Sequence, residues 1–379
     1  MRTSVAVGFA GTFAGRFHEK AIRPACPLSP SATRGVKPAA LEQQRQAVAV
    51  RKLDITVLGA GILGIWQTLT LARRGHRVRL LEASEAPFTS AASRYAGAML
   101  APYCEEEGAE PIVVELGLAA LELWKAAYPG LTQLGSLVVT APRDRPELLR
   151  FARMTRGHTT VDAAALGRLE PDLAGRFQTG LHYGAEAHMS PTAAMTFLLD
   201  AARQAGAEIR FGVSGCAAIN GQVVDCRGLA AGSLLANLRG VRGERVLIRS
   251  RDIRLNRPVR LLHPRYPLYV VPWADGHYMV GATVIESEDP SPMTLRSALE
   301  LLGLAYALHP GLGEAEVVEL GAGLRPAFPD NVPKVVVQGD RVHINGAYRH
   351  GFLLSPKLAE IAAVYLETGE RHPVIMVDG

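Results

Sequence analysis

The clearest pattern of hydrophobic positions begins near residue 54, where a short apolar run leads into a glycine-rich turn. The run Asp54-Ile-Thr-Val-Leu predicts a parallel strand buried on both faces. The turn Gly59-Ala-Gly61-Ile-Leu-Gly64 follows, and a helical pattern then extends from Ile65 to Arg74. Gly75 is a typical residue to end that helix. These segments predict the first half of a strand-helix-strand unit.

A carboxylate closes the unit where a dinucleotide's ribose is usually bound. The next strand, Arg77-Val-Arg-Leu-Leu, ends at Glu82, eighteen positions after Gly64. In such turns the first glycine permits the tight bend, the second lets N–H groups approach a pyrophosphate, and the third lets helix and strand pack closely. The residues predicted to bind a dinucleotide are Gly59, Ala60, Gly61, Ile62, Leu63, Gly64 and Glu82. The pattern admits FAD or NAD, and the alternative is a turn without a ligand.

Strand-like patterns further along the chain predict a second, mainly antiparallel sheet. They lie at Gly135–Thr140, Arg245–Arg249, Leu268–Pro272 and His277–Thr283. The fold class expected is α/β plus α+β, a Rossmann-type domain interleaved with an antiparallel sheet domain. Its nucleotide-binding parts are expected at about 53–105, 176–235 and 320–379, and its substrate-binding parts at about 106–175 and 236–319.

The first 52 residues differ in composition from the rest of the chain. They carry nine Lys and Arg against two acidic residues, whereas the remainder has 32 basic and 34 acidic residues. The pI of about 9.1 therefore reflects an extension, and no nucleic-acid binding is expected of the main body. Three interpretations of residues 1–52 stay open: a non-functional extension, a targeting or membrane-surface segment, and a partner-binding tail.

The cysteine content and the hydropathy of the chain argue against a metal-binding protein and against a membrane-spanning one. The four cysteines form no CxxC pair and no metal-ligand spacing, so we expect no metal site and a reducing, cytoplasmic location. They are Cys26, Cys104, Cys216 and Cys226. The uncharged window Ile55–Ala72 is as long as a membrane span, but its three glycines indicate a strand, turn and helix instead. No transmembrane segment is expected.

Four segments in a fixed order resemble the FAD-dependent D-amino-acid oxidase superfamily, and most closely the glycine oxidases of thiamine biosynthesis. The resemblance extends from about Asp54 to Gly369. Its segments are Ser93–Pro102, Tyr269–Pro272 with Val280–Thr283, Gly321–Pro326 and Asn345–Pro356. The resemblance selects FAD as the cofactor. Family members commonly have glycine where this chain has Ala98.

The resemblance also implies which residues contact the flavin. The segment after the ribose-binding acid contributes Ser93, Arg94, Ala98 and Met99. Later segments contribute Gly323, Arg349, His350, Gly351, Phe352 and Leu353. By its own pattern, the last segment predicts a strand over Val342–Ala347, a turn at Gly351 and a helix capped by Ser355 with Pro356 at its first position. The positive end of that helix would favour the charge of reduced flavin.

An α-amino acid substrate presents a carboxylate, which a planar guanidinium binds through two parallel hydrogen bonds. Arg325, in Gly-Leu-Arg-Pro, stands where glycine oxidases place their carboxylate-binding arginine, and the alternative is a surface arginine. Tyr269 matches a tyrosine whose hydroxyl reaches the same carboxylate, although strands favour tyrosine in any case. Arg349 is predicted to supply a second donor or to order the cofactor loop.

The expected activity is oxidative deamination of glycine or another small amino acid or amine. Hydride passes from Cα to flavin N5, oxygen reoxidises the flavin to give peroxide, and the imine is hydrolysed or supplies thiazole synthesis for thiamine. The expected partners are the small substrate and molecular oxygen, and a homo-oligomer is compatible with the sequence. Three alternatives stay open: an amino-acid dehydrogenase with another electron acceptor, a flavoprotein of tRNA modification, and a non-catalytic flavin- or NAD-binding module.

Overall fold

The computed structural model describes residues 52–213, 219, 221–264 and 267–379. All of these residues belong to one compact unit, Val50–Gly379. The three interpretations of the N-terminal extension fall outside the described residues, as do Cys26 and Cys216.

The first sheet carries the glycine-rich turn. In the described part of the chain it has seven strands, in the order β17-β15-β16-β9-β1-β2-β8. These are β17 (Met376–Asp378), β15 (Lys334–Gln338), β16 (Arg341–Asn345), β9 (Gln222–Asp225), β1 (Asp54–Leu58), β2 (Arg77–Leu81) and β8 (Glu208–Arg210). The central pairs β9-β1 and β1-β2 are parallel. Four of the five residues of β1 are buried, as expected of a parallel strand covered on both faces.

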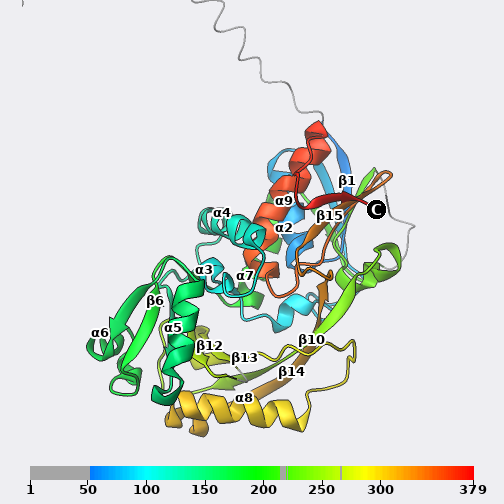
Figure 1. Ribbon diagram of the computed structural model, residues 1–379. Coiled ribbons are helices and arrows are strands. Elements are labelled where there is room, and N and C mark those ends of the chain that lie inside the picture. The colour runs from blue at the N-terminus through cyan, green and yellow to red at the C-terminus, as the bar shows by residue number, and fades with distance from the viewer. Residues whose placement is uncertain (1–51, 214–218, 220, 265–266) are drawn as a thin grey trace, which may run out of the picture. The chain divides into compact units, whose positions relative to one another are not determined.

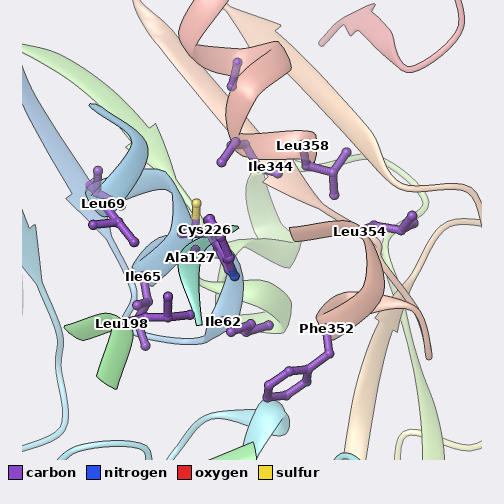
Figure 2. Packing of buried hydrophobic residues seen from close by; sticks show 14 of the residues in the cluster. Ile62, Ile65, Leu69, Ala127, Leu198, Cys226, Ile344, Phe352, Leu354 and Leu358 are labelled. Atoms are coloured by element: carbon purple, nitrogen blue, oxygen red, sulfur yellow. The ribbon is translucent and has the colours of Figure 1, made fainter. Parts of the chain in front are cut away.

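Helices cover this sheet through an apolar core. Helix α2 (Ile62–Arg73) packs against α9 (Gly351–Thr368) and α7 (Pro191–Gln204), and α4 (Pro111–Ala127) packs against α9 (Figure 1). Figure 2 shows the contact surface, where Ile65 and Leu69 of α2 lie near Leu198 of α7. The predicted strand-helix-strand unit is confirmed, and α2 begins three residues earlier than expected.

The second sheet is formed by strands that all follow β2 in the chain. Among the described residues it has eight strands, in the order β14-β10-β13-β12-β11-β4-β6-β5. These are β14 (Glu316–Ala327), β10 (Arg239–Arg249), β13 (His277–Gly281), β12 (Leu268–Pro272), β11 (Val259–Leu262), β4 (Ser136–Thr140), β6 (Thr179–Tyr183) and β5 (Thr159–Asp162). Helix α8 (Leu295–Leu308) packs against β10, β12 and β13. Every pair is antiparallel except β11-β4, so the prediction of a mainly antiparallel sheet is confirmed.

Two segments lie in a different sheet from the one that the sequence suggested. We expected 176–235 and 320–379 to belong to the nucleotide-binding part, yet β6 pairs with β4 and β5, and β14 pairs with β10. Strand partners are chosen by contacts far apart in the chain, which local patterns do not report. The remaining domain boundaries stay a prediction.

The last helix begins earlier than predicted. Helix α9 starts at Gly351 with His350 as its N-cap residue, so Ser355 is not the cap and Pro356 lies inside the helix. Proline has no N–H to donate to the carbonyl of Phe352, four residues earlier. That carbonyl instead accepts a hydrogen bond from Nε1 of Trp124 at 2.8 Å and one from the Ser355 hydroxyl at 3.3 Å. Trp124 of α4 thus supplies the hydrogen-bond donor that Pro356 lacks, so that helix α9 can contain an internal proline.

Three short elements connect the two sheets near the site. The 3₁₀ helix η2 (Ala92–Tyr95), strand β3 (Met99–Leu100) and helix α3 (Pro102–Glu105) follow one another, and β3 pairs with β7 (Ala187–His188). The remaining helices α5 (Arg145–Met154) and α6 (Ala163–Leu169) pack near β4 to β6. No helix among the described residues is long and apolar enough to cross a membrane.

Candidate active site

A cavity of about 850 Å³ extends from the glycine-rich turn to the face of the eight-stranded sheet. This volume lies near the top of the range of roughly 300–1,000 Å³ that is typical of small-molecule and cofactor sites. Its wall includes residues from β1, β2, η2, β10, β12, β14 and the start of α9. The two sheets therefore contribute to one site.

The glycine-rich turn has the geometry that dinucleotide binding requires. A Cβ atom on Gly64 would lie 1.9 Å from the carbonyl oxygen of Gly59, so only glycine allows helix α2 to pack this close to the turn. A Cβ on Gly61 would meet nothing nearer than the Ser93 hydroxyl at 3.6 Å, which leaves its backbone open to the cavity. Gly59, Gly61, Ile62 and Leu63 line the cavity, whereas Ala60 and Gly64 do not.

The carboxylate of Glu82 is fixed at the edge of this turn. It accepts a hydrogen bond from the N–H of Ala60 at 2.7 Å and another from the N–H of Ser84 at 2.9 Å. The residue is only 9% exposed, yet it lines the cavity. The Ser90 hydroxyl is a third donor at 3.3 Å, and a carboxylate with four acceptor positions and three internal partners can still accept from a ribose hydroxyl.

The segment after β2 forms the next part of the wall. Ser93, Ala98 and Met99 line the cavity, and the Ser93 hydroxyl accepts from the N–H of Ile62 at 3.1 Å. Ala98 has a φ of 51°, a left-handed conformation that favours glycine, the residue that the family resemblance implies at this position. Arg94 is not part of the wall, because its guanidinium lies 3.4 Å from Glu319.

The loop before α9 forms another part of the cavity wall, and at its end Gly351 lies close to Ile62 of the glycine-rich turn. Arg349, Gly351 and Phe352 line it, whereas His350 and Leu353 do not. Burial lowers the pKa of His350 to about 4, so the imidazole is neutral at neutral pH. The N-terminus of the 18-residue helix α9 brings a partial positive charge to this wall.

Arg325 of β14 lines the end of the cavity that the eight-stranded sheet forms. Its Nη1 donates to the backbone carbonyls of Thr283 at 3.1 Å and Arg242 at 3.3 Å. No acidic side chain among the described residues lies within ion-pair distance of its guanidinium. Burial lowers the pKa of Arg325. A partly buried cation without an acidic partner at a cavity wall is a strong attractor for an anionic ligand.

The guanidinium of Arg325 lies flat over a glycine of the adjacent strand. A Cβ atom on Gly243 would be 2.1 Å from Cζ of Arg325 and 2.3 Å from its Nη1. Strand β10 therefore leaves a space that the guanidinium fills. Gly323, which pairs with Gly243 across the two strands, also lines the cavity, and the ring of Tyr95 covers it.

Tyr269 belongs to a row of residues that crosses five strands on one face of the sheet. Arg260, Tyr269, Gly281, Arg245 and Gly321 stand directly opposite one another from β11 to β14. Tyr269 and the two arginines of this row line the cavity. Tyr348 also lines the cavity together with Arg325 and Arg349, and its N–H donates to the carbonyl of Pro326, next to Arg325, at 2.9 Å.

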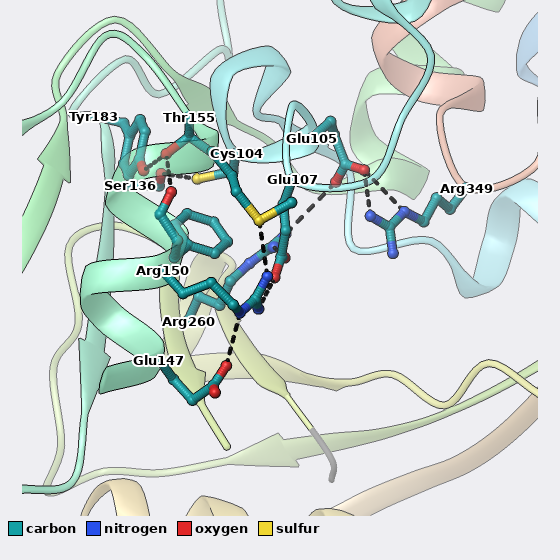
Figure 3. Close-up of polar contacts among 12 residues, drawn as sticks. Cys104, Glu105, Glu107, Ser136, Glu147, Arg150, Thr155, Tyr183, Arg260 and Arg349 are labelled. Atoms are coloured by element: carbon teal, nitrogen blue, oxygen red, sulfur yellow. Dashed lines mark hydrogen bonds and ion pairs between the residues drawn. The ribbon is translucent and has the colours of Figure 1, made fainter. Parts of the chain in front are cut away.

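Arg349 is already bound to an acid that the sequence reasoning missed. Glu105, the last residue of α3, accepts from Nε and Nη2 of Arg349 at 2.8 and 2.6 Å, and it lies 3.5 Å from Arg260 (Figure 3). Burial would raise the pKa of Glu105, but the charges of Arg349 and Arg260, and that of His350 once it is protonated at low pH, lower it to about 2. Glu105 is therefore an ionised bridge between two arginines of the cavity wall. The one sequence signal for Glu105 was its position shortly after Ser93–Pro102, the segment that the resemblance assigns to the flavin.

A second buried acid lies behind this wall. Glu186 accepts from the N–H of Cys104 at 2.8 Å and from the hydroxyl of Ser136. Burial raises the pKa of Glu186 to about 7 and raises that of the Cys104 thiol well above its usual value. Cys104 is not among the residues that line the cavity.

These features define a class of protein: a nucleotide-cofactor enzyme of two sheets whose cavity ends at an arginine without an acidic partner among the described residues. A family model described as FAD dependent oxidoreductase matches residues 54–364, and the chain belongs to that family. The predicted resemblance, the fold class and the choice of FAD are thereby confirmed.

Individual relatives agree with this assignment. The chain is 47% identical over 323 residues to the putative thiamine biosynthesis oxidoreductase ThiO of Rhizobium etli, covering 85% of this chain and 98% of that one. It is 26% identical over 371 residues to glycine oxidase of Geobacillus kaustophilus, covering 84% and 94%. Among solved structures, glycine oxidase from Bacillus cereus superposes with a TM-score of 0.73 at 21% identity, covering 86% and 99%. That last similarity concerns the fold alone.

Proposed function

We propose that this enzyme oxidises the amine of glycine or another small amino acid. The observation that carries the proposal is the partly buried guanidinium of Arg325, which borders the cavity without an acidic partner among the described residues. A substrate carboxylate would supply the missing negative charge. The printed names of the relatives, a thiamine biosynthesis oxidoreductase and glycine oxidases, support the same substrate class.

The hydrogen bonds of Arg325 leave one edge for the substrate. Nη1 is occupied by two backbone carbonyls, whereas Nε and Nη2 make no hydrogen bond with the described residues. Those two groups form the geometry that binds a carboxylate through parallel hydrogen bonds. Tyr269, two strands away from β10 on the same face, would donate its hydroxyl to the same carboxylate.

FAD supplies the redox chemistry when it is bound, accepting the two electrons that leave the substrate's Cα–H bond. The chain's residues fit that cofactor: the open backbone at Gly61 faces the cavity, and Glu82 stands at the edge of the turn. Ser93, Ala98 and Met99 on one side and Gly351 and Phe352 on the other would hold its ring system.

The protein's part in the reaction is binding and orientation. Arg325 and Tyr269 would fix the carboxylate and so determine which face of Cα points into the cavity. Arg349 would remain a positioning residue, because Glu105 already occupies two of its donor groups. We propose that electrons pass on to oxygen and give peroxide, and that the imine product supplies thiazole synthesis for thiamine; the name of the Rhizobium etli relative, a thiamine biosynthesis oxidoreductase, supports a role in thiamine biosynthesis.

An anaerobic spectral titration tests the proposal. Glycine is expected to bleach the absorbance of the bound flavin, and air should restore it with formation of peroxide. Arg325→Ala should retain FAD but lower kcat/KM for glycine by about 100-fold or more, since it removes two hydrogen bonds to a charged group. Unchanged glycine turnover by Arg325→Ala would refute the assignment. Restored absorbance only with an artificial acceptor would indicate a dehydrogenase.

A further inference from the structure

Four arginines border the cavity from the eight-stranded sheet and the loop before α9, and acids compensate three of them. Arg245 pairs with Glu319 at 3.0 Å, and Arg349 pairs with Glu105 at 2.6 Å. The third, Arg260, lies 3.5 Å from Glu105 and 3.7 Å from Glu107. Arg325 is the member of this group that lacks an acidic partner in the described part of the chain. Among the described residues, this part of the wall thus presents one positive charge without an acidic partner, that of Arg325.

We propose that Glu105 is the residue that restricts this enzyme to substrates with a single carboxylate. The inference rests on the proposed role of Arg325. Glu105 occupies Nε and Nη2 of Arg349, the edge of the guanidinium that would otherwise bind a second carboxylate. The same carboxylate lies between Arg349 and Arg260 (Figure 3). One acid therefore masks two cations of the cavity wall.

The position of Arg349 makes it accessible to a bound substrate. Its side chain is 36% exposed, compared with 13% for Glu105, and both residues line the cavity. Arg349 and Arg325 both line the cavity, and the residues next to them are joined by a hydrogen bond from the N–H of Tyr348 to the carbonyl of Pro326 at 2.9 Å. A dicarboxylate held at one end by Arg325 would bring its second carboxylate into this neighbourhood, where the ionised Glu105 repels it.

Removal of the charge of Glu105 should therefore change the choice of substrate. Glu105→Gln keeps the shape of the side chain but leaves Arg349 and Arg260 with excess positive charge. Iminodiacetate is a suitable probe, because it is glycine with a second carboxymethyl group on nitrogen and is achiral. The ratio of kcat/KM for iminodiacetate to that for glycine should rise by about tenfold or more, the effect of roughly one added charge interaction in a partly buried site.

A neighbouring glutamate provides the matched control. Glu106 accepts hydrogen bonds from Nε and Nη2 of Arg156 and does not line the cavity, so Glu106→Gln removes the same charge one residue away. This variant should leave the ratio unchanged. The double variant Glu105→Gln, Arg349→Gln should lose the gain, because it removes the group proposed to bind the second carboxylate.

Folding is followed independently of activity, by the FAD content and thermal unfolding of each variant. If Glu105→Gln folds poorly, binding of malonate and acetate to the flavin-loaded enzyme by difference absorbance gives the same comparison without turnover. An unchanged ratio in Glu105→Gln, with glycine still oxidised by the unaltered enzyme, would overturn the role of Glu105 alone. If the unaltered enzyme oxidises neither compound, the proposed function itself fails.

Discussion

The space that the guanidinium of Arg325 fills over Gly243 leads to a prediction in which one substitution weakens ligand binding much more than folding stability. In Gly243→Ala the new methyl group would overlap Cζ and Nη2 of Arg325, each 2.1 Å from the Cβ position. The overlapping atoms are the end of a flexible side chain, so the guanidinium can move away without disturbing the strands. Alanine is also favoured over glycine in a strand interior by about 0.5–1 kcal/mol. We therefore expect the stability to change by no more than about 1 kcal/mol.

Binding of a carboxylate should suffer much more than folding. A guanidinium displaced from Gly243 loses its anchors on the carbonyls of Arg242 and Thr283 and no longer presents the same edge to a ligand. Loss of one or two hydrogen bonds to a charged group costs about 2–3 kcal/mol. At about 1.4 kcal/mol for each factor of ten, the affinity should fall about 30- to 150-fold.

The assay measures carboxylate binding and turnover on flavin-loaded enzyme. Glycolate, which has the carboxylate of glycine but no amine, reports binding through the flavin absorbance, and glycine reports kcat and KM. The control is Gly240→Ala, on the same strand but facing away from the cavity, where the nearest atoms would be 3.3 Å from the new methyl. Equal glycolate affinity in Gly243→Ala and the unaltered enzyme would show that the position of Arg325 does not depend on this glycine.

Two further predictions concern the buried polar groups. Trp124→Phe should destabilise the fold by about 2–4 kcal/mol, because the Phe352 carbonyl opposite Pro356 loses its main donor. Trp66→Phe is the control, since the indole N–H of Trp66 is buried and has no hydrogen-bond partner among the described residues. Chemical denaturation should give a smaller loss of stability for Trp66→Phe than for Trp124→Phe. Glu186 has a folded pKa of about 7, raised by burial, so it destabilises the fold as pH rises from the usual carboxyl pKa towards 7. Glu186→Gln should therefore gain stability relative to the unaltered enzyme between pH 5 and pH 8; a difference between the two proteins that does not vary over that range would contradict the reasoning.

The nucleotide-binding half of the site was predictable because its signals are local. Turn-forming glycines, a strand before them and an acid after the next strand lie within about 30 residues of one another, and each reflects a backbone requirement at its own position. The structure bears out the packing role of Gly64 and places Glu82 at the turn. The strand segments of the second sheet were also detectable from their apolar patterns. Their pairing was not, and β6 was therefore assigned to the other sheet.

The part of the site that is proposed to bind the substrate depends on contacts between residues far apart in the chain. Glu105 and Arg349 are separated by 244 positions, and Trp124 and Phe352 by 228. The Ser-Pro pair at 355 and 356 has the usual appearance of a helix start, and only the distant Trp124 explains why the helix begins earlier. Gly243 carried a usable signal, since a glycine inside a strand often marks the close approach of another group. The identity of that group could come only from the structure.

The same long-range contacts explain how a cavity with several arginines can select one orientation of a small substrate. If all four guanidinium groups were equally available, a carboxylate could bind at several points with its reacting carbon differently placed. Acids compensate Arg245, Arg260 and Arg349, while Arg325 is held by backbone carbonyls. Carbonyl dipoles fix the direction of a guanidinium without neutralising its charge. In the proposed function, the distribution of partners, rather than the number of cations, would therefore direct the substrate carboxylate to one wall of the cavity.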